Sequence, residues 1–123
     1  MGLDMYVYKT SSVLTSEVDF EPEVDDLELV HQWRKHPNLH GWMEALYRSK
    51  GGKEDYFNCV NVALSSEDLD ELEQYIESND LPETYGFFFG SSDGSEREDD
   101  LQFLKAARAA LNDGKCIFYR SWW

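Results

Sequence analysis

Apolar residues recur at helical spacing between Asn38 and Lys50. The stripe occupies positions i, i+3, i+4, i+7 and i+8 and consists of Leu39, Trp42, Met43, Leu46 and Tyr47. A helix with one apolar face is stable only when a second layer of structure covers that face. Asn38 is the natural N-cap, and the Gly51-Gly52 pair provides the left-handed conformation that ends many helices. The pattern therefore predicts a helix over residues 38–50 that packs against another layer.

That second layer is predicted to be a β-sheet. Residues 3–9 alternate between apolar and polar side chains, which predicts a strand with a polar but aromatic outer face. The outer face consists of Asp4, Tyr6 and Tyr8. Residues 57–64 and 116–122 are predicted to form two further strands. The run 86–90 is apolar on both faces, which favours a strand in the centre of the sheet.

Two more helices follow from the sequence. Ser65 and Asp68 resemble a capping box and open a helix. Its core-facing residues are Leu69, Leu72 and Ile76. A third helix runs from about residue 96 to residue 112, and its acidic first turn suits the positive end of the helix dipole. The predicted order of elements is therefore β-α-β-α-β-α-β.

A chain of 123 residues has room for one domain with one hydrophobic core. We expect a single small domain of the α+β class, in which one four-stranded mixed sheet is packed by about three helices, mainly on one side. The segment 10–28 is expected to be a loop, and the segment 31–36 a short turn. We expect no cofactor and no metal.

The chain carries a formal net charge of −14. This charge repels DNA, RNA and anionic lipid at long range, so we expect neither direct nucleic-acid binding nor membrane binding. No apolar run approaches the ~20 residues that span a bilayer, and no signal segment opens the chain, which favours a soluble cytoplasmic protein. Cys59 and Cys116 fall in apolar runs and are expected to be buried free thiols.

Positive charge is concentrated in residues 31–53. This segment holds five basic residues and one acid, a net charge of +4, whereas six basic and 24 acidic residues give the remainder a charge of −18. It also holds all three histidines and two of the four tryptophans. Guanidinium and ammonium groups neutralise phosphate, and indole rings stack on a base. We therefore expect a non-enzymatic protein that binds an anionic, nucleotide-like small molecule. The expected ligand-binding residues are Trp33, Arg34, Lys35, His36, His40 and Arg120.

Two other functions stay open. In the first, the acidic residues of segments 67–77 and 96–100 imitate nucleic acid, so that the protein inhibits a basic host or phage protein. In the second, the protein is a small hydrolase in which His40 and Glu44 serve as base and acid.

Two further local patterns resemble ligand sites, but less closely than the basic segment 31–53 does. His36, His40 and Glu44 stand at i, i+4 and i+8, which on an unbroken helix would suit a metal. Pro37 belongs at the first helical position, however, so His36 lies at or before the cap. The glycine-containing turn 90–94 precedes a helix, as in some phosphate sites, but the acids around it oppose an anion.

Several segments together resemble an uncharacterised family of small proteins of phages and prophages. Members of that family open with MGLDMYL, carry a WRK…IH.WF segment and a GFFFGS segment, and end near SSW. The matching segments here are 1–6, 33–35, 40–42, 81–82, 86–91 and 121–122, and the chain departs from the pattern at Pro37-Asn38 and in the turn 92–94. The resemblance implies an accessory protein of the host cytoplasm, a context in which counter-defence binding proteins are common.

Overall fold

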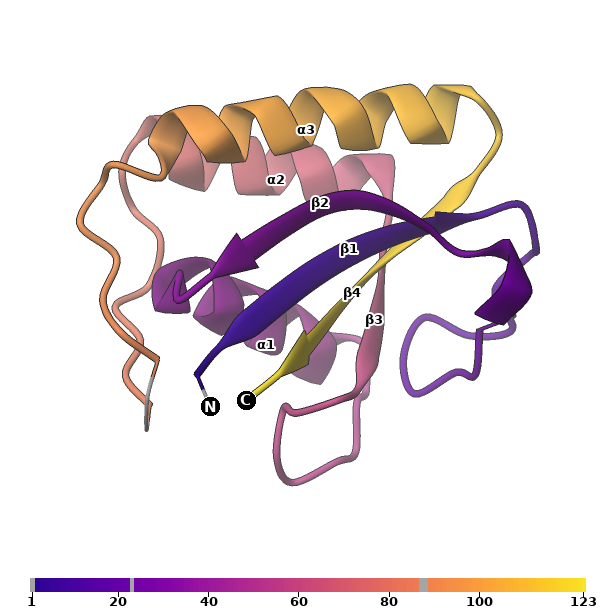
Figure 1. The fold of residues 1–123 in the computed structure, drawn as a ribbon, viewed down its shortest axis with the longest axis horizontal. Coiled ribbons are helices and arrows are strands. Elements are labelled where there is room, and N and C mark those ends of the chain that lie inside the picture. The colour runs from indigo at the N-terminus through magenta and orange to yellow at the C-terminus, as the bar shows by residue number, and fades with distance from the viewer. Residues whose placement is uncertain (1, 23, 87–88) are drawn as a thin grey trace.

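The computed structural model describes residues 2–22, 24–86 and 89–123. Its elements follow one another as β1 (Asp4–Thr10), the 3-10 turn η1 (Val24–Asp26), β2 (Glu28–Arg34), α1 (Pro37–Ser49), β3 (Asn61–Leu64), α2 (Ser66–Glu77), α3 (Arg97–Asn112) and β4 (Cys116–Trp122). Figure 1 shows the strands side by side, with α2 and α3 next to each other. The predicted α+β class, with four strands and three helices among the described residues, is confirmed.

The sheet has the strand order β2-β1-β4-β3, and each neighbouring pair is antiparallel. The prediction of a mixed sheet is thereby corrected. Consecutive strands β1 and β2 pair directly through a returning loop whose described residues form no regular element except the short turn η1. Such a direct return makes neighbouring strands antiparallel. The order of elements is β-β-α-β-α-α-β rather than a strict alternation.

Strand β2 occupies a segment for which the sequence predicted loop and turn. Its side chains do not alternate in burial, since Leu29 is 51% exposed and Trp33 is the one buried residue of the strand. Its pairing with β1 also shifts register between Val7 and Tyr8. Edge strands are covered less completely than central ones, so β2 lacks the period-two pattern from which strands are recognised.

The strand predicted over 86–90 falls partly on residues 87–88, which lie outside the described residues. Gly86, Phe89 and Gly90 belong to none of the four strands. The strand predicted over 57–64 is shortened to β3, because Cys59 has a φ of 59° and interrupts the extended backbone. Phe57 therefore enters the core from a loop rather than from the sheet.

Helix α1 begins two positions earlier than predicted, as its N-cap shows. Its N-cap is His36 and Pro37 occupies the first helical position, so Asn38 lies inside the helix instead of capping it. The C-terminal prediction is confirmed: Gly51 has a φ of +92°, its N–H bonds to Arg48 O, and Gly52 N–H bonds to Tyr47 O. These two bonds form a Schellman motif, which satisfies carbonyls at the helix end.

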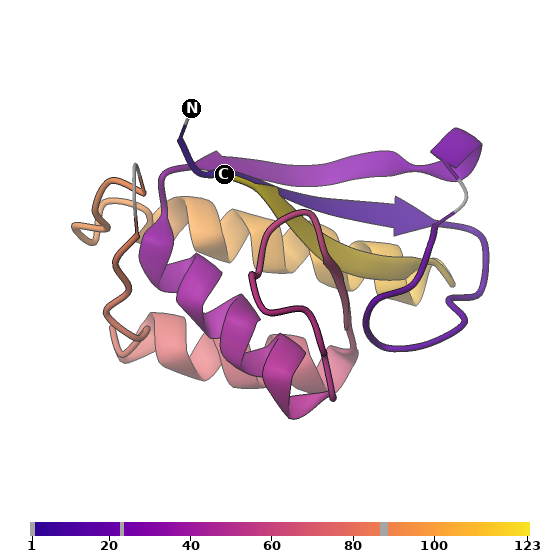
Figure 2. The ribbon, with the colours of Figure 1, turned by 90° about the horizontal axis from the view of Figure 1, so that it is seen from below.

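The alternation of β1 and β4 gives the sheet two different faces. On one face Val7 and Tyr119 are completely buried, and the Tyr119 hydroxyl contacts His40 of α1. In Figure 2 strands β1 and β2 lie along one side of the molecule, and helices α1 and α2 lie on the other. On the second face Phe20, from the loop after β1, covers Phe118 with a ring-centroid distance of 5.3 Å. The part of this second face that Phe20 does not cover is a candidate functional surface.

Candidate functional site

The six residues predicted to bind a ligand do not converge on one site. Arg34 and Arg120 lie on the second face of the sheet, on opposite sides of β1, because both are paired with residues of its outer face. Trp33 and His36 are buried on the helix side and share Asp100 as a partner. The predicted cluster is therefore divided by the sheet into a surface part and a buried part.

The surface part contains three aromatic side chains beside a guanidinium group. Tyr6 and Tyr8 stack at a centroid distance of 5.9 Å, and Trp122 is 66% exposed next to them. They line a cavity of about 280 Å³ together with Arg120, Ser121 and Cys59. We call Tyr6, Tyr8, Arg120 and Trp122 the open face.

The charged group at the centre of the open face is the Arg120 guanidinium. Arg120 donates from Nη1 to Oδ1 of Asn61 at 3.1 Å, a neutral partner that does not compensate the guanidinium charge. Arg34 lies 3.6 Å from Asp4 and keeps 61% of its side chain exposed. Burial, followed by the nearby Asp4 carboxylate, raises the pKa of Tyr6 above its ordinary value of 10. Tyr6 therefore keeps its proton at neutral pH and can donate a hydrogen bond.

The buried part is a chain of hydrogen bonds that joins three elements. His36 Nδ1 lies 2.7 Å from Ser92 Oγ, and His36 Nε2 lies 2.9 Å from Asp100 Oδ2. The indole N–H of Trp33 donates to the other carboxylate oxygen of Asp100 at 3.0 Å. The backbone N–H of Asn38, in the first turn of α1, donates to Ser92 Oγ at 3.1 Å. We call Ser92, His36 and Asp100 the polar relay.

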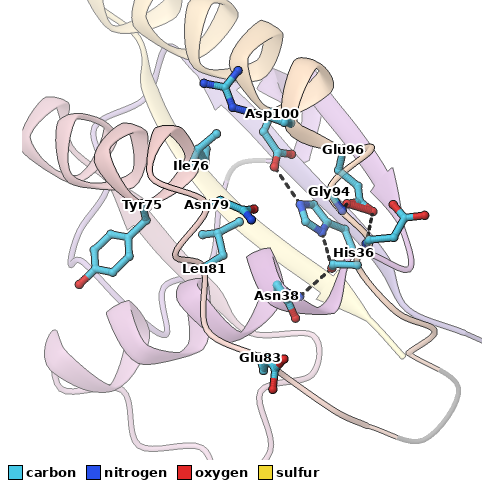
Figure 3. Close-up of a pocket in the computed structure, with 13 residues that line it drawn as sticks. His36, Asn38, Tyr75, Ile76, Asn79, Leu81, Glu83, Gly94, Glu96 and Asp100 are labelled. Atoms are coloured by element: carbon cyan, nitrogen blue, oxygen red, sulfur yellow. Dashed lines mark hydrogen bonds and ion pairs between the residues drawn. The ribbon is translucent and has the colours of Figure 1, made fainter.

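The polar relay borders a cavity of about 290 Å³ between α1, α2 and the start of α3. Figure 3 shows Asp100 reaching from α3 toward His36, with Asn38 below them and Ile76 and Leu81 across the cavity. His36 and Asp100 are 3% and 2% exposed, respectively, whereas Ser92 is partly exposed. Ser92 is thus the member of the relay that is accessible from the cavity.

His40 lies in the core and belongs to neither site. Its ring lies among Phe57, Phe89 and Tyr119, and its Nδ1 is 2.7 Å from the Tyr119 hydroxyl. Burial lowers the pKa of His40 to about 4. Glu44, its proposed acid partner, pairs instead with Arg48 at 3.3 Å. This geometry gives no support to a hydrolase built on His40 and Glu44.

Lys35 joins the chain segment before α1 to the glycine-containing turn 90–94. It adopts a left-handed φ of 57°, and its N–H bonds to Leu3 O at 2.8 Å. Gly90, with a φ of +75°, approaches so closely that a Cβ there would lie 3.0 Å from the Lys35 Cβ. Only glycine meets both requirements without strain. Glycine at position 90 therefore allows the turn that carries Ser92 to pack against the segment just before α1.

The glycine-containing turn itself is occupied by a carboxylate of the same chain. The N–H groups of Asp93 and Gly94 both donate to the Glu96 carboxylate, at 3.3 and 3.0 Å. These are the N–H groups that a phosphate would need. The turn therefore binds its own acid in the position that the sequence suggested for phosphate.

Three residues that the sequence suggested as metal ligands have separate partners. His36 contacts Ser92 and Asp100, His40 contacts Tyr119, and Glu44 contacts Arg48. Among the described residues, no three histidine, cysteine or acidic side chains gather closely enough to hold a metal ion. Both cysteines are free thiols, as predicted, but Cys59 is exposed and Cys116 is partly exposed, which corrects their expected burial.

The acidic residues divide between surface and interior. On α2 the exposed acids are Glu67, Asp70, Glu71 and Glu77. Arg108 of α3 bonds to Asp70 and Glu73 at 2.8 and 3.0 Å and so ties the two helices together. Asp100, in contrast, is buried in the polar relay and is not part of an acidic surface.

Sequence reasoning assigned no site to Trp122, placed Asp100 in an acidic surface and Ser92 in a possible phosphate turn, and did not connect either residue to His36. Asp100 stood among other acids at the start of a predicted helix, and its spacing of 64 residues from His36 carries no local signal. Trp122 was part of a predicted strand, and its strand position relative to Tyr6 depends on the β1–β4 register. The alternating aromatic residues Tyr6 and Tyr8 were recognised as an outer face, which is the one local signal for the open face.

No protein-family model matches this chain, and no curated protein or solved structure is significantly similar to it. In the part of the chain that the structure describes, no helix is both long and apolar enough to cross a membrane. The proposed functions therefore depend chiefly on the geometry and charge of the two sites.

Proposed function

We propose that the protein is a binding module for a nucleotide-like small molecule, which it holds on the open face of the sheet. The observation that carries the proposal is the arrangement of Tyr6, Tyr8 and Trp122 with Arg120 around one cavity of about 280 Å³. A planar base would stack on the exposed indole of Trp122, as bases do on aromatic side chains. A phosphate would lie against Arg120, whose guanidinium group can form charge-assisted hydrogen bonds.

The charge distribution supports an anionic ligand at this face. The chain as a whole carries −14, so an anion is repelled from most of its surface. Arg120 of the open face bonds to the neutral Asn61, and Arg34 lies at its edge beside Asp4. The Tyr6 hydroxyl adds a neutral donor. A small ligand that contacts only this region gains attraction without approaching the acidic helices.

Binding of a small ligand at this face agrees with the accessory role that the resemblance to phage proteins implies. Relative to the sequence prediction, the proposed ligand contacts keep Arg120, with Arg34 at the edge of the face, and leave out the exposed Lys35 and the three buried side chains. Trp33, His36 and His40 contribute to the fold beneath the sheet, and the aromatic contacts come from β1 and β4 instead.

Titration of the full chain with nucleoside 5′-monophosphates tests the proposal. Trp122 is exposed and Trp123 partly exposed, while Trp33 and Trp42 are 4% and 6% exposed, so a stacked base should quench the solvent-accessible part of the wild-type tryptophan fluorescence. The affinities of the variants are measured by isothermal titration calorimetry, because Trp122→Ala removes the fluorescent reporter. Trp122→Ala should weaken binding by about tenfold or more, because stacking on an aromatic side chain contributes ~1–3 kcal/mol per base. Arg120→Gln should weaken binding by a similar factor, since hydrogen bonds to charged groups contribute ~1.5–3 kcal/mol.

Two substitutions elsewhere serve as matched controls. Tyr85 is 82% exposed on a segment outside the sheet, and Arg97 is an exposed cation at the start of α3. Tyr85→Ala and Arg97→Gln should leave the affinity unchanged. If no mononucleotide binds at millimolar concentration, or if the control variants lose as much affinity as Trp122→Ala, the proposal is wrong.

A second candidate function rests on the acidic outer side of α2. Four exposed carboxylates on one helix, Glu67, Asp70, Glu71 and Glu77, resemble the spacing of negative charge that a basic protein recognises. In this case a basic protein would bind, its complex would weaken steeply with salt, and Trp122→Ala would have no effect on it. The fluorescence titration thus distinguishes the two candidates.

A further inference from the structure

The polar relay lies on the other side of the sheet from the open face and has a different chemistry. We propose that Ser92 is the nucleophile of a hydrolytic site for small acyl esters, with His36 as its general base and Asp100 as the residue that positions His36. The proposal stands on the geometry around one cavity and does not depend on nucleotide binding.

The order of contacts is that of a serine–histidine–aspartate triad. Ser92 Oγ lies 2.7 Å from one ring nitrogen of His36, and Asp100 Oδ2 lies 2.9 Å from the other. Such triads are recognised by geometry and roles rather than by sequence order. Here the nitrogen beside the serine is Nδ1, so the ring is used in the opposite sense to the worked serine-protease template.

Asp100 fixes both the orientation and the proton of His36. A carboxylate accepts hydrogen bonds, so the His36 proton lies on Nε2, and the Nδ1 lone pair is directed toward Ser92. The second oxygen of Asp100 accepts the indole N–H of Trp33, which holds the carboxylate in place within a nearly dry environment. Pro37 follows His36 and is the first residue of α1, so the histidine backbone is anchored as well.

The first turn of α1 contributes a second contact to Ser92. The N–H of Asn38, near the positive end of α1, donates to Ser92 Oγ at 3.1 Å. Ser92 can therefore accept one bond from the helix and donate its own proton to His36. A serine that only capped α1 would make the first of these contacts but would not need the buried histidine and aspartate behind it.

The proposed reaction is balanced by water alone. Ser92 Oγ forms a bond to the acyl carbon while its proton passes to His36 Nδ1, and the carbonyl electron pair moves onto the carbonyl oxygen. When the electron pair returns, the bond to the leaving alcohol breaks, and the alcohol oxygen takes the proton from Nδ1. A water molecule then attacks the acyl-serine, gives a proton to Nδ1, and releases the acid as Ser92 Oγ regains its proton. The sum is ester plus water to acid plus alcohol.

The cavity indicates the class of ester. Its apolar wall is formed by Ile76, Leu81 and Tyr75, which suits a short hydrocarbon group. Its charged rim carries three carboxylates against one guanidinium: Glu83, Asp93, Glu96 and Arg97. Like charges repel across a cavity of this size, so esters with an uncharged or cationic group should be accepted and anionic esters rejected.

Reaction of the full chain with a fluorophosphonate probe tests the proposal. The expected adduct lies on Ser92 and is located by peptide mass spectrometry. Ser92→Ala should abolish it, whereas Ser91→Ala, the neighbouring exposed serine, should leave the labelling rate unchanged. His36→Gln should slow labelling by about 100-fold or more, the usual contribution of a general base. If Ser92 had only a structural role, removing His36 would not change its labelling rate.

Two results would overturn the proposal. One is the absence of a Ser92 adduct in the folded wild-type protein at saturating probe, which needs no variant to be informative. The other is equal labelling of wild type and a folded His36→Gln variant, with folding checked by circular dichroism. Hydrolysis of p-nitrophenyl butyrate should likewise disappear in Ser92→Ala and persist in Ser91→Ala, and p-nitrophenyl succinate should be a poor substrate. Labelling should be unaffected by Trp122→Ala, so failure here and failure of nucleotide binding are separate outcomes.

Discussion

His36 and His40 lie four residues apart, yet their imidazole rings meet opposite surroundings. His36 lies between a carboxylate and a hydroxyl group at the edge of a cavity, whereas the His40 ring lies among three aromatic rings. The difference arises because His36 precedes the first turn of α1 and His40 lies on its buried face. Sequence spacing alone made the two residues look equivalent.

The burial of His40 predicts how stability depends on pH. Its folded-state pKa is about 4, below the ordinary value of 6.5, so between these pH values the unfolded chain binds a proton that the folded protein does not. The free energy of unfolding should therefore fall as the pH falls through this window. The free energy of unfolding that is lost through His40 amounts to about 3 kcal/mol when the pH has fallen to about 4.

Urea unfolding of wild type and His40→Gln at about pH 7 and about pH 4.5 measures this effect. Glutamine does not titrate, and His31 and His36 are present in both proteins, so the difference between the two isolates His40. Wild type should lose more stability on acidification than the variant does. Equal losses would show that His40 is not a buried, neutral histidine.

At the scale of elements, helix α2 depends on its first turn. Ser65 Oγ accepts the Asp68 N–H, and the Asp68 carboxylate accepts the Ser65 N–H, which is the capping box that the sequence predicted. Asp68 also bonds to the ammonium group of Lys50 at 2.6 Å, which connects the start of α2 to the end of α1. The cap therefore stabilises the junction of two helices.

Ser65→Ala should lower the free energy of unfolding by about 1 kcal/mol, because the N-cap acceptor is lost. Ser66→Ala is the matched control, since Ser66 is exposed and its hydroxyl contacts only the neighbouring Glu67. Chemical denaturation should show a shift for the first variant and little change for the second. Equal shifts would mean that the cap contributes nothing beyond general effects of the substitution.

The elements that could be predicted are those with strong local signals. Helix α1 was located from its apolar stripe and its Gly51-Gly52 end, and β4 agrees with its predicted range. Strand β2 could not be predicted, because an edge strand with an exposed Leu29 and a register shift has no regular pattern. Its pairing partner decides its conformation, and that partner is known only from the fold.

The candidate sites were predictable only in part for the same reason. Arg34 and Arg120 were chosen from charge and type, and the sheet places them on one face, with β1 between them. Ser92 and Asp100 meet His36 across 56 and 64 residues of sequence, and no local spacing reports such a contact. Trp33 was expected at the surface, but the indole ring is buried where it orients Asp100.

At the scale of the whole molecule, one sheet separates two surfaces of different chemistry. The open face carries aromatic rings and Arg120, and the helix side carries the acidic α2 surface and the cavity of the polar relay. An anionic ligand should choose the first surface, and a basic protein the second. The central claim is that a nucleotide-like ligand binds at the open face.

Backbone amide chemical shifts of the full chain, recorded during titration with a nucleoside 5′-monophosphate, test this claim most directly. We expect saturable shifts at the open-face residues of β1 and β4, centred on Tyr6, Arg120 and Trp122, and no change along α2. Shifts confined to α2 or α3, or no shifts at millimolar ligand, would contradict the account.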